Sequence, residues 1–147
     1  MGNSSETGGL DDFSRRYLYL LCGAVGIGLV WWLTSLDYRA GELNDLLEAD
    51  EELSTYPYQF KVISLNNGIA RMSSPRSAQM SAIQGLRIMF PELKSVSADS
   101  AQMMAAQERL ARTQSYAANL VTAEPDVSRI VWVLDERWLA NSGVYVQ

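Results

Sequence analysis

The sequence predicts a single N-terminal transmembrane helix followed by a small α+β domain, with a mostly antiparallel sheet that carries two or three helices on one face. Three observations lead to this fold class. Residues 17–36 form an apolar run without any charged side chain. Two strand-like segments flank the turn sequence Asn66-Asn67-Gly68. Helical segments then alternate with further strand-like segments, as is typical of α+β sandwiches.

The 147 residues divide into four predicted parts. Residues 1–16 are rich in Gly, Ser and Asp, which is typical of a disordered tail, here a cytoplasmic one. Residues 17–36 are the transmembrane helix and residues 37–53 an acidic helical connector. Residues 54–147 form the extracytoplasmic α+β domain, because about 90 residues suffice for one small hydrophobic core.

The apolar run has the length of a membrane span. An α-helix rises about 1.5 Å per residue, so this run reaches about 30 Å, the thickness of the hydrocarbon core. Tyr17 and Tyr19 lie at one end, and Trp31 and Trp32 lie near the other, where amphipathic aromatic residues are enriched. The run exceeds the roughly 7–15 apolar residues of a cleaved signal peptide, and no small-x-small cleavage site follows it. We therefore expect an anchor that is not removed.

Charged residues around the apolar run predict its orientation. Arg15 and Arg16 precede it, whereas Arg39 is the one base close behind it. The positive-inside rule then places the N-terminus in the cytoplasm. We expect a single-pass protein of the cell inner membrane whose C-terminal domain is periplasmic.

Small residues within the run predict a helix-packing surface. Gly23, Gly26 and Gly28 make a small-residue face together with Ala24, and such faces allow close approach of a second helix in lipid. Gly23, Ala24 and Gly28 are the helix-packing candidates, since Ala24 and Gly28 form a small-xxx-small pair. The partner is a membrane protein or a second copy of the chain. The alternative is that glycine is simply frequent in transmembrane helices.

The connector is strongly acidic. Between Asp37 and Glu52 it holds seven acids and one base, in a chain of net charge -5. Leu43, Leu46 and Leu47 follow helical spacing, which predicts a short amphipathic helix. Its acids would be repelled by anionic headgroups and would hold the domain off the membrane surface.

The first half of the domain is predicted as a hairpin followed by a helix. Strands at residues 60–65 and 69–72 flank the turn, since Asn and Gly accept a positive φ at low cost. A helix over residues 77–90 is ended by Pro91. Residues 93–96 then predict a short strand.

The second half is predicted as a long helix and two strands. Asp99 begins the helix, with Gln102 in capping-box position. Residues 127–134 are almost continuously apolar, which favours an inner strand of the sheet. A turn at residues 141–143 precedes a last edge strand over residues 144–146.

Residues 43–96 resemble the BON module of bacterial envelope proteins. The resemblance rests on residues 67–73, the helix that follows them, and the bend and strand of residues 90–96. Glu92 stands where that family has Gly. The resemblance implies the element order helix, strand, strand, helix, strand, an envelope location, and binding of membranes or ring-forming partners without catalysis.

Composition argues against an enzyme. The chain has no histidine and one cysteine, Cys22, which lies within the apolar run. The commonest general base, zinc ligand and nucleophile partner are therefore missing, and we expect no cofactor, no metal site and no nucleic-acid partner. Asp135 and Glu136 are adjacent carboxylates, but neighbours on a strand point to opposite faces. Lys61 and Lys94 are the only lysines and form no Ser-x-x-Lys pattern.

The leading hypothesis is a non-enzymatic scaffold, assembly factor or accessory subunit of an envelope complex. Trp138 and Tyr145 are its predicted interface residues, since exposed aromatic side chains often anchor protein contacts. The first alternative is a lipid- or ligand-sensing periplasmic binding module. The second is a small envelope hydrolase that uses Asp135 and Glu136.

Overall fold

The computed structural model describes residues 12–145, apart from the side chains of residues 35–37. Two compact units are distinguished, Met1–Ser35 and Leu36–Gln147, and each is described by itself. Helix α1 (Asp12–Ala49) contributes to both. Most of the predicted tail, residues 1–11, lies outside the described part of the chain, whereas Asp12 to Arg16 are helical.

The first unit consists, in its described part, of the apolar half of α1. Every side chain from residue 12 to residue 34 is exposed, including Leu20 at 74% and Ile27 at 73%. By length and composition the helix is able to cross a membrane. An apolar surface on all sides of a helix is unfavourable in water, so it requires lipid or a protein partner.

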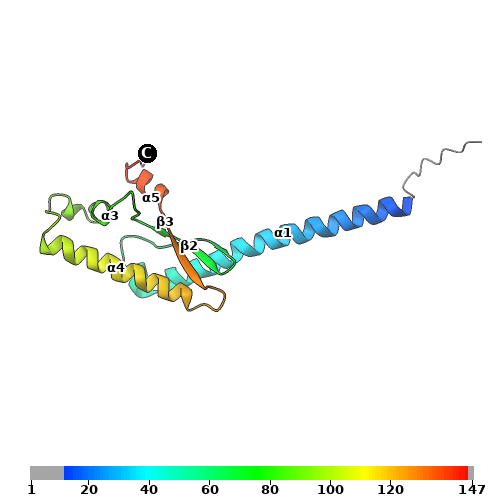
Figure 1. Ribbon diagram of the computed structural model, residues 1–147, viewed down its shortest axis with the longest axis horizontal. Helices are drawn as coiled ribbons and strands as arrows, with labels where there is room; N and C mark the ends of the chain where they lie inside the picture. The colour runs from blue at the N-terminus through cyan, green and yellow to red at the C-terminus, as the bar shows by residue number, and fades with distance from the viewer. Residues whose placement is uncertain (1–11, 146–147) are drawn as a thin grey trace, which may run out of the picture. The chain divides into compact units, whose positions relative to one another are not determined.

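The second unit contains a three-stranded mixed sheet, in the order β1-β2-β3 (Figure 1). Strands β1 (Val62–Asn66) and β2 (Ile69–Ser74) pair antiparallel, which confirms the predicted hairpin. Asn67 has a φ of 49° and Gly68 a φ of 76°. Two consecutive positive φ values are what a two-residue hairpin loop requires, and Asn-Gly supplies them.

Strand β3 (Arg129–Leu134) pairs parallel with β2 and forms an edge of the sheet. The prediction of an inner strand was therefore wrong. The chain passes from β2 to β3 through two helices, and a crossover of that kind delivers the next strand parallel to the first. The apolar sequence of β3 is thus left with one unpaired side among the described residues.

Five shorter helical segments complete the second unit. They are α2 (Glu51–Ser54), α3 (Ala82–Met89), the 3-10 turn η1 (Pro91–Leu93), α4 (Ala101–Thr122) and α5 (Glu136–Asn141). Helix α4, yellow in Figure 1, packs against α3 and β3.

The starts of two helices differ from the prediction because of their caps. Helix α3 begins five residues later than expected, since Ser81 and Gln84 form a capping box at its N-terminus. At α4 the cap is Ser100, whose hydroxyl accepts from the backbone N–H of Met103, rather than Asp99.

The short strand predicted at residues 93–96 is wrong. Pro91 opens η1 instead, and backbone N–H groups of Leu93 and Val96 donate to carbonyls three residues earlier. Proline fixes φ near the helical value, which favours a 3-10 turn at this point.

The C-terminal prediction also changes. Trp138 and Leu139 lie in α5, which is capped by Asp135, and Val144 donates its backbone N–H to the carbonyl of Leu139. Residues 144 and 145 are therefore not a strand, and residue 146 lies outside the described residues.

The acidic segment that we expected to be a connector belongs to the folded unit, which starts at Leu36 rather than at residue 54. Leu43 is 1% exposed and Leu47 is 2% exposed, and both join one core with Met72 and Leu110. The leucine spacing thus places Leu43 and Leu47 on the face of the helix that packs into the core of the domain. Glu42, Asp45 and Glu48 of the same helix are exposed to solvent.

Arg39 connects this helix to the segment that follows α4. Its guanidinium donates to both carboxylate oxygens of Asp126 at 2.7 Å, to Glu124 at 2.7 Å and to Glu42 at 2.8 Å. These hydrogen bonds raise the pKa of Arg39 and lower the pKa of Asp126. Glu124 and Asp126 are 85 and 87 residues away in sequence, so this contact joins the beginning of the folded unit to a segment near its C-terminal end.

The lowered pKa of Asp126 predicts a loss of stability in acid. Its ordinary value is 3.8, and the hydrogen bond from Arg39 is the main cause of the shift. The unfolded chain then binds this proton at a higher pH than the fold does. The contribution of Asp126 to the free energy of unfolding is therefore fully present above pH 3.8 and is lost as the pH falls through its lowered pKa. Urea unfolding at pH 5 and pH 3 checks this: Asp126→Asn should lose less stability between the two pH values than the wild type, and an equal loss would contradict it.

Gly85 in α3 is fixed by a close backbone approach. A Cβ atom there would lie 2.7 Å from the carbonyl oxygen of Pro75, whereas at Gly41 it would meet nothing within 4 Å. We expect Gly85→Ala to cost about 1–3 kcal/mol through overpacking and Gly41→Ala to stabilise by about 0.5–1 kcal/mol through helix propensity. Urea unfolding of the two variants measures the change in the free energy of unfolding, which should be a loss for Gly85→Ala and a gain for Gly41→Ala. A stabilising Gly85→Ala would contradict the close approach.

Candidate functional site

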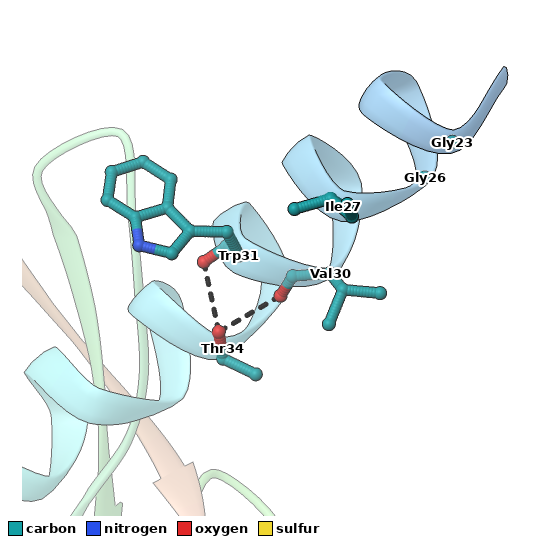
Figure 2. A pocket seen from close by; sticks show the side chains of 6 residues that line it. All are labelled: Gly23, Gly26, Ile27, Val30, Trp31 and Thr34. Atoms are coloured by element: carbon teal, nitrogen blue, oxygen red, sulfur yellow. Dashed lines mark hydrogen bonds between the residues drawn. The ribbon is translucent and has the colours of Figure 1, made fainter. Parts of the chain in front are cut away.

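The first unit carries a shallow groove on one side of α1. Figure 2 shows the residues that line it, with two glycines at one end: Gly23, Gly26, Ile27, Val30, Trp31 and Thr34. The spacing of these residues follows the helical repeat of 3.6 residues, so they share one face. Added Cβ atoms at Gly23 and Gly26 would meet nothing within 4 Å.

The one hydroxyl in the lining is already satisfied. Thr34 Oγ1 donates toward the carbonyl oxygens of Val30, at 2.9 Å, and Trp31, at 3.0 Å (Figure 2). Back-bonding of this kind removes the penalty of placing a hydroxyl in an apolar setting. The groove is thus suited to another apolar surface.

The predicted small-residue face coincides with the groove in two of its four residues. Gly23 and Gly26 both lie in the lining. Ala24 and Gly28 are four residues apart and therefore share a ridge of α1, but neither belongs to the lining. The signal that identifies the groove in the sequence is the spacing of residues 23, 26, 27, 30 and 34.

A second cleft lies in the folded unit, at the C-terminal end of β3. Its volume is about 490 Å³, and it is lined by Lys61, Ile63, Ser73, Val133, Leu134, Asp135, Glu136 and Arg137. Apolar strand residues and both signs of charge therefore meet there. The predicted carboxylates Asp135 and Glu136 both belong to this lining.

Asp135 holds the elements around this cleft together. Its Oδ2 accepts from the hydroxyl of Tyr58 at 3.0 Å, and its Oδ1 accepts from the backbone N–H of Trp138 at 3.0 Å. Tyr58 is 1% exposed, and burial is the main reason why its pKa is raised, so it remains a donor. Both carboxylate oxygens are thus engaged in capping α5 and anchoring Tyr58.

Ser73 forms two hydrogen bonds with the backbone of Lys61. The hydroxyl oxygen of Ser73 accepts from the backbone N–H of Lys61 at 3.0 Å, and the N–H of Ser73 donates to the carbonyl of Lys61. Ser73 is 3% exposed. A nucleophilic serine needs access to substrate and a base at its hydroxyl, so this pair fits a structural role better.

The two predicted interface aromatics differ in their surroundings. Trp138 is half-buried, and its ring makes an edge contact with Tyr58 at a centroid distance of 5.1 Å. Tyr145 is 80% exposed. Tyr145 is therefore free to contact a partner, while Trp138 already packs against the domain.

A third feature, which the sequence did not indicate, lies between α2 and α4. A small pocket there is lined by Glu52, Thr55, Tyr56, Arg109, Arg112 and Thr113. The ring of Tyr56 lies 5.4 Å below the guanidinium of Arg109. Its hydroxyl is buried and has no hydrogen-bond partner among the described residues. An unsatisfied buried hydroxyl is uncommon and needs an explanation.

No protein-family model matches this sequence, and no curated protein or solved structure is significantly similar to it.

Proposed function

We propose that this chain is a single-pass inner-membrane protein that acts as a non-enzymatic scaffold, assembly factor or accessory subunit of an envelope complex. The observation that carries the proposal is the apolar half of α1, whose side chains are exposed on every side over residues 12–34. Lipid removes this surface from water, and a bilayer core of about 30 Å fits the apolar run of residues 17–36.

The proposed orientation has the N-terminus in the cytoplasm and the domain in the periplasm. Arg15 and Arg16 precede the apolar run, and Arg39 alone follows closely. The bias of Lys and Arg toward the cytoplasmic side supports this direction. A reporter that is active only in the periplasm, fused to the C-terminus, tests it.

In this proposal the groove on α1 receives a helix of a membrane partner or of a second copy. A floor of glycines permits close helix contact, which is a main source of helix association in lipid. The BON resemblance remains part of the proposal. Residues 93–96 do not supply the strand that it requires, and the next strand, β3, comes only after a further helix, α4.

The groove predicts a selective effect of filling it. Gly26→Leu should weaken helix association about tenfold, which corresponds to about 1.4 kcal/mol, because the leucine occupies the place of the partner helix. Gly28→Leu is the matched control, since Gly28 lies outside the lining and is equally open. Energy transfer between labelled copies measures association with a second copy. Co-purification from mild detergent measures association with a membrane partner. Equal behaviour of the two variants would contradict a role for the groove.

A second candidate function is a lipid- or ligand-binding module, and the pocket at Tyr56 favours it. Arg109, Arg112 and an unpaired hydroxyl are suited to a small anionic group. With inorganic phosphate as the probe, this function predicts saturable binding that Tyr56→Phe weakens. If the pocket binds nothing, Tyr56→Phe should instead raise stability by about 1 kcal/mol, because it removes an unsatisfied buried group.

A further inference from the structure

The free edge of β3 presents backbone groups without partners in the described residues. The backbone N–H of Arg129 donates to Gly68 at 3.1 Å, and that of Asp135 donates to Ser74 at 2.9 Å. In a parallel ladder alternate residues bond to the same neighbour, so residues 129, 131, 133 and 135 face β2. The N–H and C=O groups of Ile130, Trp132 and Leu134 therefore point outward, away from the sheet.

The opposite edge of the same sheet is protected. Strand β1 has a register shift between Val62 and Ser64. The side chain of Asn44, from α1, also accepts from the N–H of Val62 at 2.6 Å and donates to its carbonyl at 3.0 Å. A bulge and a covering side chain are known ways to prevent strand addition.

No such protection is found along β3. Its six residues pair with β2 in unbroken register, without a bulge. Its sequence, RIVWVL, contains neither proline nor lysine, and none of its residues is fully buried. Val131 is 37% exposed. A regular, apolar, unpaired edge strand is a template for another strand.

We propose that β3 pairs antiparallel with β3 of a second copy, which joins the two sheets into one of six strands. The charges at the two ends of β3 favour a second copy as the partner and an antiparallel direction of pairing. Arg129 begins the strand and Asp135 follows its end, so an antiparallel pair aligns opposite charges at both ends, whereas a parallel pair would align like charges. Isologous pairing of this kind also closes as a dimer.

The backbone selects the register. With Trp132 opposite itself, Ile130 of one copy faces Leu134 of the other, and all three outward-pointing residues exchange hydrogen bonds. The same register places Arg129 opposite Asp135 and Val131 opposite Val133. Residues 131 and 133 then form a non-hydrogen-bonded pair, with Cα atoms about 4.5 Å apart.

This inference deepens the proposed scaffold role by naming a partner, and it does not depend on the groove of α1. Disulfide cross-linking of the full chain in mild detergent tests it, because Cα atoms about 4.4–6.8 Å apart can be bridged. All variants carry Cys22→Ser, which removes the single native thiol. Two differently tagged chains are prepared, one with Val131→Cys and one with Val133→Cys.

Mild oxidation should link the two tagged chains when they are mixed, and each chain alone should remain largely unlinked, since equal positions lie on a diagonal about 7–8 Å apart. Ile63→Cys is the control, because Ile63 is 52% exposed but lies on β1, the protected edge. Cross-linking through Ile63, or none in the mixture, would overturn the proposal.

A second variant separates this interface from the membrane anchor. Val131→Lys places a charge on an exposed edge position, which should lower the dimer fraction at least tenfold and leave near-ultraviolet circular dichroism and membrane retention unchanged. An unaltered dimer fraction would contradict strand pairing. Loss of the chain from the membrane in the wild type would contradict the proposed anchor and not the pairing.

Discussion

Replacement of Leu43 by alanine should destabilise the folded unit by about 2–5 kcal/mol, the usual cost of a large cavity in a core. Leu43 is 1% exposed and lies in the acidic part of α1, packed in the same cluster as Met72 and Leu110. The expected loss is large because Leu43 is almost fully buried, so that its truncation leaves a cavity in this cluster. Urea unfolding of the full chain in mild detergent, followed by the near-ultraviolet signal of the aromatic cluster, measures it.

The matched control is Leu46→Ala in the same helix. Leu46 is only half-buried, so its truncation should cost less than half as much as that of Leu43. The comparison decides whether residues 37–53 are a connector or a part of the fold. Equal and small losses at both positions would mean that this helix is not part of the core.

Replacement of Arg39 by alanine should cost about 1.5–3 kcal/mol, the range for hydrogen bonds to charged groups. The guanidinium is the shared donor of three carboxylates, and its side chain is 28% exposed. Without it, Glu42, Glu124 and Asp126 repel one another across the junction of α1 with the end of α4. Urea unfolding at pH 7 measures the loss, and Arg39→Lys should recover only part of it, because lysine cannot form the bidentate contact.

Arg112→Ala is the control for the Arg39 experiment. Arg112 lies 4.0 Å from Glu108, and both side chains are more than 70% exposed. An exposed pair of this type contributes about 0–1 kcal/mol. If Arg39→Ala proved no more destabilising than Arg112→Ala, the carboxylate cluster would not hold the helix to the domain.

Elements that depend on local sequence were predictable. The hairpin follows from the Asn-Gly turn, and α4 follows from an apolar stripe that ends before Pro125, although its N-terminal cap is Ser100 and not the predicted Asp99. The long apolar helix follows from an uninterrupted run of uncharged residues. In each case a few adjacent residues carry the whole signal, so tertiary context had little to add.

Features that depend on distant contacts were not predictable. An apolar strand looks the same in the middle of a sheet and at an unpaired edge, which is why β3 was misplaced. The leucines of residues 43–53 predicted a helix but not the surface that it covers. Arg39 appeared only as a charge beside the apolar run, because its partners Glu124 and Asp126 come after α4, 85 and 87 residues later in the chain.

The candidate site was predicted in part, for a geometrical reason. The predicted small-residue face included Gly23 and Gly26, which line the groove, but also Ala24 and Gly28, which lie outside the lining. The rest of the lining consists of larger residues one and two turns later, which a search for small residues does not select. The unpaired hydroxyl of Tyr56 could not be predicted from the sequence, since burial and the absence of a partner are properties of the fold.

Extraction of membranes with alkaline carbonate tests the central claim most directly, because it releases peripheral proteins and leaves spanning helices in lipid. An antibody against the C-terminal domain should find the intact chain, at its full mass of 16.4 kDa, in the membrane pellet. A chain in which Leu21, Ile27 and Leu33 are replaced by Asp should be found in the supernatant. Release of the intact wild-type chain would contradict the account.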